Sequence, residues 1–211
     1  IAVDLDEGDC LVGAAITDGK HDVMLFSDAG KAVRFDENDV RPMGRTARGV
    51  RGMNLGEGQE VIAMLVAPAE ISEEASMNTD TTANDAPSSV LTATENGFGK
   101  RTPIAEYTRH GRGTKGMIAI QTSERNGKVV AAALVSPEDQ IMLITTGGVL
   151  VRTRVSEIRE MGRSTQGVTL INVDEGTHLS GLQRIAESDS DDDADVLGEE
   201  SDNLSESSGD A

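Results

Sequence analysis

Basic turns bracketed by glycines are the residues of this sequence best suited to chemistry. The motif G-R-x-x-x-G occurs three times, at 44–49, 111–116 and 162–167. Glycine lets the backbone bend sharply and exposes the residues between, so the cations of such a turn can reach phosphates. The candidate DNA contacts are Arg45, Arg48, Arg112, Lys115 and Arg163 in the turns, with Arg51, Lys100, Arg101, Arg152 and Arg154 extending the row.

A row of cations of this kind binds the nucleic-acid backbone without reading bases. Aromatic stacking platforms are nearly absent, which disfavours single strands as the target. A solvated loop with incidental charge is the alternative interpretation of the turns, although no acid recurs within them. Three arginines outside the turns could instead pair inside a unit, because an acid follows each by five residues. These pairs are Arg34 with Asp39, Arg101 with Glu106, and Arg152 with Glu157.

Other chemistry has little support in the sequence. There is no phosphate-binding loop and no nucleophile motif. The three histidines, His21, His110 and His178, occupy unrelated positions and suggest surface or turn residues. The single cysteine, Cys10, excludes an internal disulfide and is expected to be a small core residue. We therefore expect no enzyme activity from this chain by itself, no cofactor and no metal site.

The net charge of −18 would by itself argue against nucleic acid. Its distribution weakens that argument. Residues 187–211 hold eleven acids and no base, and residues 68–88 hold five acids and no base. The rest of the chain carries 19 basic and 21 acidic residues. Residues 187–211 have the composition of a disordered acidic tail, which could compete with DNA for the basic turns.

An internal repeat of about 50 residues organises the chain. Gly30, Gly97 and Gly148 occupy equivalent positions, and each basic turn ends nineteen residues after one of them. An arginine follows each of these glycines by four residues. Residues 1–20 resemble the end of a preceding unit, and residues 68–88 are an insertion that we expect to form a loop.

The repeat predicts an all-β, propeller-like fold with four short strands in each unit. Val23–Ser27, Val90–Thr94 and Ile141–Thr145 are apolar and β-branched, and glycine-containing turns follow them. Tyr107 aligns with Val40 and Ile158, which predicts a packing residue. We expect blades over 1–186 and the acidic tail over 187–211. Three and a half units fall below the usual 4–8 blades, so we expect a fragment or part of a spiral.

These units resemble those of the C-terminal domain of the DNA gyrase A protein. The stretches VMLFSDAGKAVRF, GRTARGVRGMNLGEGQEV, ATENGFGKRTPIAEY, TKGMIAI, TSERNGKVV and LVRTRVSEIREMGRSTQGV carry the similarity, which with flanks covers about 1–186. The resemblance implies a six-bladed β-pinwheel whose blades exchange strands. It also implies a basic outer rim that wraps duplex DNA with little sequence specificity and directs strand passage toward negative supercoiling.

Further expectations follow from the resemblance. The partners would be the gyrase B protein, together with the rest of the gyrase A protein, within an ATP-dependent type II topoisomerase whose catalytic tyrosine and ATPase lie outside this chain. The location would be the bacterial cytoplasm and nucleoid, with no membrane. The family's Q-R-R-G-G-K-G box does not occur here. The A-type subunit of topoisomerase IV therefore remains an alternative, and a propeller that serves as a protein-interaction scaffold is an alternative of another class.

Overall fold

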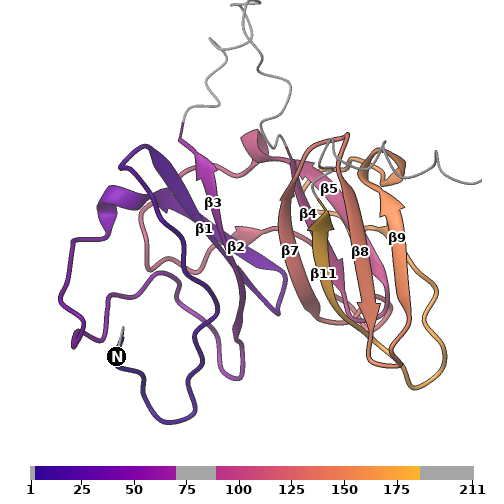
Figure 1. Cartoon of the computed structure of the whole chain (residues 1–211), viewed down its shortest axis with the longest axis horizontal. Helices are drawn as coiled ribbons and strands as arrows, with labels where there is room; N and C mark the ends of the chain where they lie inside the picture. The colour runs from indigo at the N-terminus through magenta and orange to yellow at the C-terminus, as the bar shows by residue number, and fades with distance from the viewer. Residues whose placement is uncertain (1–2, 70–88, 186–211) are drawn as a thin grey trace, which may run out of the picture.

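A computed structural model describes residues 3–69 and 89–185, and β-strands dominate it (Figure 1). Three antiparallel sheets follow one another in chain order across the molecule. The first sheet has the order β3-β1-β2-β6, the second β10-β5-β4-β7, and the third β11-β8-β9. This arrangement confirms the all-β, propeller-like fold predicted from the repeat.

The bounds of the elements follow the repeat. In the first unit they are β1 (His21–Ser27), β2 (Lys31–Asp36), η1 (Glu37–Asp39) and β3 (Val61–Pro68). In the second they are β4 (Ser89–Thr94), β5 (Phe98–Pro103), η4 (Ile104–Glu106), β6 (Met117–Ile118) and β7 (Val129–Val135). In the third they are β8 (Gln140–Thr145), β9 (Leu150–Arg154), η5 (Val155–Glu157), β10 (Val168–Thr169) and β11 (Leu179–Ile185).

Each unit opens with a hairpin closed at the expected glycine. Gly30 has a φ of 75° and Gly97 a φ of 78°, a conformation that residues with a Cβ rarely adopt. Both glycines also touch the following unit. The carbonyl oxygen of Gly30 accepts the backbone N–H of Ala119 at 2.9 Å, and that of Gly97 accepts the N–H of Leu170 at 2.8 Å. Each of these repeated glycines therefore shapes the hairpin turn of its own unit and also contacts the next unit.

The fourth strand of a sheet comes from the next unit along the chain. β6 lies in the second unit but pairs with β2 in the register Ala32↔Met117. β10 lies in the third unit but pairs with β5 in the register Gly99↔Val168. The expectation of four strands within each unit is corrected in this respect, and strand exchange agrees with what the resemblance implies.

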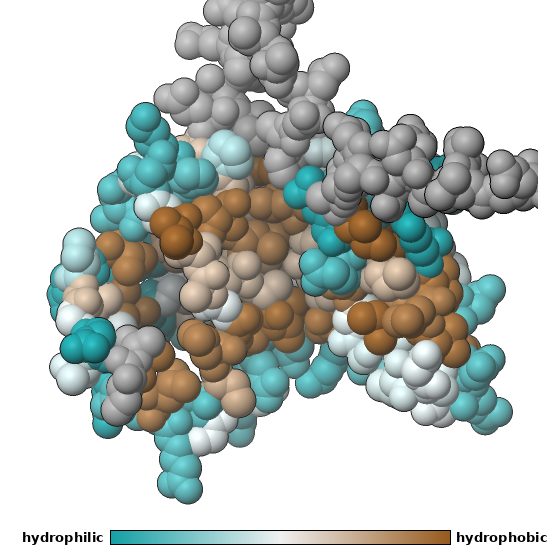
Figure 2. Space-filling view, viewed as in Figure 1, coloured by the Kyte–Doolittle hydropathy of each residue, from teal (hydrophilic) through white to brown (hydrophobic). Residues whose placement is uncertain are grey.

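Buried side chains link neighbouring sheets into a continuous core. One cluster includes Met24 and Phe26 of β1, Val90 of β4 and Tyr107 of the second unit. The Tyr107 ring packs edge-on against Phe26 with centroids 6.0 Å apart, which confirms its predicted packing role. A second cluster joins the second and third sheets. On the face seen in Figure 2, hydrophobic side chains gather over the first and third sheets.

One expectation for the N-terminal residues is wrong. Cys10 is exposed rather than part of the core. The apolar run 11–16 forms no strand, and Ile16 is fully exposed. The equivalent run, β3, is held by its ladder with β1, and no described strand offers residues 11–16 such a partner. The expected loop at 68–88 and the expected tail at 187–211 lie almost wholly outside the described residues.

The contacts between sheets distinguish an inner edge from an outer one. β7 contacts both β3 and β11, so these three strands lie together on the inner side. From β3 and β7 the strand order runs outward to β6 and β10. The short strands β6 and β10 therefore mark the outer edge of the first and second sheets. Over residues 3–69 and 89–185, no helix has the length and apolar character needed to cross a membrane.

Candidate nucleic-acid interface

The basic turns of the second and third units lie at this outer edge. Residues 111–116 lead directly into β6, and residues 162–167 lead into β10. The last glycine of each turn packs against the preceding sheet with a positive φ, 74° at Gly116 and 81° at Gly167. A Cβ at Gly167 would lie 2.7 Å from the carbonyl oxygen of Gly99. These glycines therefore let the turn approach a neighbouring strand closely.

The first arginine of the second turn and that of the third turn each join two units. Arg112 donates from Nη1 to the carbonyl oxygen of Arg51 at 3.2 Å and from Nε to that of Asp39 at 3.0 Å. Arg163 donates from Nη1 to the carbonyl oxygen of Ile118, in the preceding unit, at 3.0 Å. Arg112 remains exposed and Arg163 half-buried. Both can present only part of the guanidinium to a phosphate.

Lys100 is not a surface cation, so its assignment as a DNA contact is wrong. Its side chain is completely buried on β5. Its ammonium donates to the carbonyl oxygens of Gly162 at 2.5 Å and Arg163 at 2.7 Å. A buried charge requires such partners, and these hydrogen bonds leave it turned away from solvent.

The arginines of β2, β5 and β9 have partners other than those considered from the sequence. Arg34 pairs with Asp22 at 2.6 Å and is nearly buried. Arg101 donates to the carbonyl oxygen of Ile158 at 2.7 Å, and Arg152 donates to Gln140 at 2.6 Å. The hypothesis that these three arginines pair with Asp39, Glu106 and Glu157 is therefore wrong. Arg154 does meet Glu157, in an exposed pair with 3.7 Å between charged atoms.

Several cations at or beside the turns are exposed and have no side-chain partner among the residues the structure describes. Arg48 is not one of them, because it lies 3.0 Å from Asp6. Two of these cations, Arg41 and Arg159, were not predicted. The sequence contained a signal for both, since Arg41 and Arg159 each stand three residues before the first glycine of a basic turn. The exposed, unpaired cations are Arg41, Arg45, Arg51, Lys115 and Arg159.

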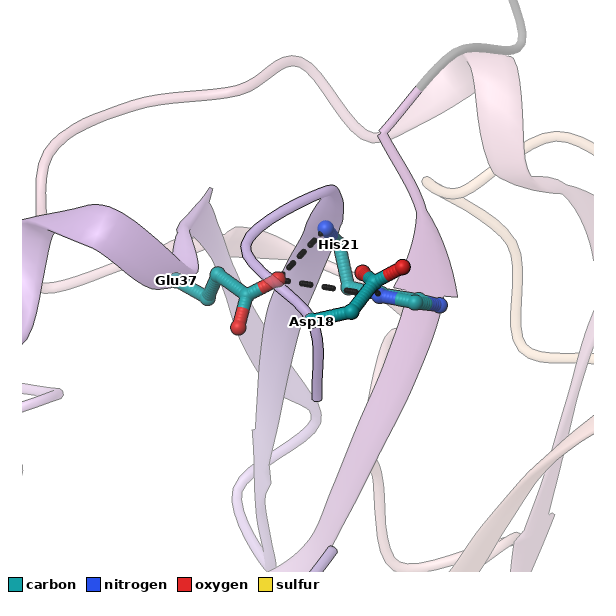
Figure 3. A group of neighbouring side chains, drawn as sticks. All are labelled: Asp18, His21 and Glu37. Atoms are coloured by element: carbon teal, nitrogen blue, oxygen red, sulfur yellow. Dashed lines mark hydrogen bonds and ion pairs between the residues drawn. The ribbon is translucent and has the colours of Figure 1, made fainter. Parts of the chain in front are cut away.

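A polar cluster lies where residues 17–20 meet the first sheet. Figure 3 shows the carboxylates of Asp18 and Glu37 converging on His21. His21 Nδ1 lies 2.9 Å from Asp18 and 3.6 Å from Glu37, while its backbone N–H donates to Glu37 at 2.7 Å. Hydrogen bonds from the Lys20 backbone and from the Thr17 side chain lower the pKa of Asp18 and of Glu37, respectively. Since these interactions supply partners to the polar groups of the cluster, we interpret it as a structural contact that holds residues 17–20 against the first sheet.

Comparison with known families identifies the repeat. The model described as "DNA gyrase C-terminal domain, beta-propeller" matches residues 21–68, 88–136 and 139–186, which are the three units of the structure. The chain belongs to the DNA gyrase C-terminal domain family. The gyrase A protein of Pseudomonas aeruginosa is 50% identical over 196 residues, and that of Escherichia coli 47% identical over 197 residues. Each alignment covers 93% of this chain, which spans only about a fifth of either relative, 19% and 21%.

Solved structures agree with the DNA gyrase C-terminal domain assignment. A DNA gyrase A C-terminal domain superposes with a TM-score of 0.73 at 26% identity, over 88% of this chain and 57% of that one. The C-terminal domain of DNA topoisomerase IV also superposes with a TM-score of 0.73, over 87% of this chain and 52% of that one. Its identity is 23%, so it shows the shared fold alone. The close relatives favour gyrase A over the topoisomerase IV alternative.

Proposed function

We propose that this chain binds the backbone of duplex DNA along its outer edge and bends the DNA around it. The single observation that carries the proposal is the set of exposed, unpaired cations at the basic turns. Arg45, Lys115 and Arg159 supply one such cation in each unit. The turns of the second and third units lie at the outer edge, and we infer from the repeat that the first turn continues the same row, which would suit the regularly spaced phosphates of a duplex.

Some cations of this chain pair with carboxylates and others do not. This difference explains how a chain of net negative charge can bind DNA. Arg34, Arg109 and Lys128 pair with carboxylates, so their charge is compensated locally. Arg45, Arg51 and Lys115 face solvent without a carboxylate among the described residues. Such cations can release the counterions of DNA when they bind, which supplies most of the affinity for a duplex of any sequence.

Within a gyrase, this binding would serve strand passage. The chain would act as a non-catalytic part of the gyrase A protein that presents wrapped DNA to a catalytic tyrosine elsewhere and biases the reaction toward negative supercoiling. The rest of that protein, with the gyrase B protein and its ATPase, would complete an ATP-dependent type II topoisomerase in the bacterial cytoplasm, associated with the nucleoid. Family membership and the two gyrase A relatives support this proposal.

A triple substitution tests the DNA-binding surface. We expect Arg45→Gln, Lys115→Gln and Arg159→Gln together to weaken binding to a random-sequence duplex on the order of tenfold or more at moderate salt. The melting temperature should hardly change, because exposed charges contribute little to stability. Fluorescence anisotropy and thermal melting give the two readouts.

A second triple variant controls for net charge. Lys20→Gln, Arg125→Gln and Lys128→Gln remove the same charge outside the basic turns. This control should bind DNA much more tightly than the turn variant does. Equal affinities of the turn variant and the unaltered chain would contradict the proposal and leave a protein-interaction scaffold as the function to test.

A further inference from the structure

A lysine without solvent exposure lies beneath the third basic turn. Lys100 is completely buried, and its aliphatic chain crosses from β5 to the turn of the next unit. Its ammonium donates to two consecutive carbonyl oxygens, those of Gly162 and Arg163, at 2.5 and 2.7 Å. These carbonyls begin the turn 162–167. A protonated lysine thus fixes the backbone from which the Arg163 side chain projects.

Other side chains of the second unit hold the same part of the chain, residues 161–163. The Thr102 hydroxyl donates to the carbonyl oxygen of Met161 at 2.9 Å. A carboxylate oxygen of Glu106 accepts the backbone N–H of Arg163 at 3.0 Å. Arg163 in turn donates to the carbonyl oxygen of Ile118. Lys100 is therefore the cationic member of a set of hydrogen bonds that fixes residues 161–163.

The other units lack this lysine at the equivalent position. Val33 occupies it in the first unit and Val151 in the third. Beside Val33 there is a small cavity of about 270 Å³, bordered by Thr114, Lys115 and Gly116 of the second turn. The second turn is held instead by Gly113, whose N–H donates to the carbonyl oxygen of Gly52 at 2.6 Å. A valine is thus compatible with the fold here.

Charge and burial compete at Lys100. Burial lowers the pKa of its ammonium to about 8, Glu106 opposes that shift, and Arg163 adds to it. The Tyr107 hydroxyl is also near these groups, but burial raises its pKa, so it stays neutral. Within 3–69 and 89–185, the charged groups that act on Lys100 are therefore one carboxylate and one guanidinium, and the guanidinium belongs to the turn that Lys100 holds.

We propose that Lys100 is a positioning residue for DNA binding, which locks the third basic turn in its DNA-binding conformation without touching DNA. The inference rests on the proposed function. A phosphate at Arg163 would favour the charged form of Lys100, so bound DNA and the Lys100 proton stabilise each other. DNA affinity should therefore fall as Lys100 loses its proton.

Lys100→Val tests the inference, since valine is the residue that the other units carry. The unaltered chain should bind a random-sequence duplex about three- to tenfold more weakly at pH 9.5 than at pH 7, at constant ionic strength. Lys100→Val should be weakened by a similar factor at pH 7 and show little further change with pH. Lys128→Met is the matched control, because Lys128 pairs with Asp28 at 2.8 Å away from the turn. It should keep the pH profile of the unaltered chain.

Two outcomes separate the inference from the proposed function. In the first outcome, the unaltered chain binds DNA, thermal melting shows that Lys100→Val is folded, and this variant keeps the DNA affinity and pH profile of the unaltered chain. Lys100 is then only structural, and the inference fails. If the unaltered chain does not bind duplex DNA at all, the proposed function fails. Backbone amide signals of residues 162–164 should also titrate near pH 8 in the unaltered chain and not in Lys100→Val.

Discussion

Arg34 and Asp22 form a buried ion pair at the junction of the first and second sheets, with 2.6 Å between Nε and Oδ2. Nη1 of Arg34 also donates to the carbonyl oxygens of Ile104 and Tyr107, each at 3.1 Å. Arg109 of the second unit binds the other carboxylate oxygen of Asp22 at 2.6 Å. At the next junction, Arg101 repeats the contact with the carbonyl oxygen of Ile158. The recurring arginine is thus a latch between units.

The latch leads to a prediction about stability. Asp22→Asn should lower the free energy of unfolding by about 3–5 kcal/mol, because it leaves the buried guanidinium of Arg34 without a carboxylate and removes one of the two carboxylates that Arg109 contacts. Chemical denaturation would measure the loss. Glu157→Gln breaks the exposed pair with Arg154 and should cost less than about 1 kcal/mol. Similar losses in the two variants would contradict the latch.

The two cations of the second turn should behave differently. The Arg112 side chain donates hydrogen bonds to two carbonyl oxygens of the first unit, so Arg112→Gln should weaken DNA binding and also lower the melting temperature. Lys115 has no side-chain partner among the described residues, so Lys115→Gln should weaken DNA binding alone. Melting and anisotropy measured on both variants check the distinction, which fails if Lys115→Gln is the less stable of the two.

Lys100 should give stability a pH dependence of known sign. Burial lowers its pKa to about 8 from the ordinary 10.5. Between these values the unfolded chain binds a proton that the folded chain has released, so the free energy of unfolding rises with pH. Between pH 7.5 and pH 10, the free energy of unfolding of the unaltered chain should rise more than that of Lys100→Met, by on the order of 1–3 kcal/mol. Urea titrations at several pH values would measure it, and a difference that falls with pH would contradict the assignment.

The tail gives a prediction from composition alone. Deleting residues 187–211 removes eleven carboxylates. If the tail competes for the basic turns, its removal should tighten duplex binding at low salt, and the gain should shrink as salt screens both interactions. Amide shifts near Arg45, Arg112 and Arg163 should change on deletion. Unchanged shifts would exclude docking of the tail, even where affinity rises.

The glycine register made much of the fold predictable. Gly30 and Gly97 need a positive φ in their hairpins, and they recur in sequence because each hairpin needs one. The exchange of β6 and β10 was not visible in the repeat itself, because a repeat shows that units are equivalent but not which unit each strand joins. Residues 11–16 illustrate the same gap, because an apolar run alone cannot show whether a ladder partner exists.

The candidate site was predicted in part. The turns were found because their glycines and arginines recur. The burial of Lys100 could have been predicted, since Val33 and Val151 occupy the same position and an aligned pair of valines indicates a core site. The hydrogen bonds that Arg112 and Arg163 donate across units could not be predicted. Their acceptors are backbone carbonyls of another unit, which leave no pattern of side chains in the sequence.

The salt dependence of duplex binding by the unaltered chain tests the central claim most directly. Seven cations are available to phosphates if Arg112 and Arg163 contribute alongside Arg41, Arg45, Arg51, Lys115 and Arg159, and we expect about six phosphates to be neutralised. The logarithm of the association constant should then fall against the logarithm of salt concentration with a slope of roughly −5, at ~0.9 per phosphate neutralised. Unrelated duplex sequences should agree within a few-fold. A slope near zero, or strong preference for one sequence, would contradict binding through the phosphate backbone.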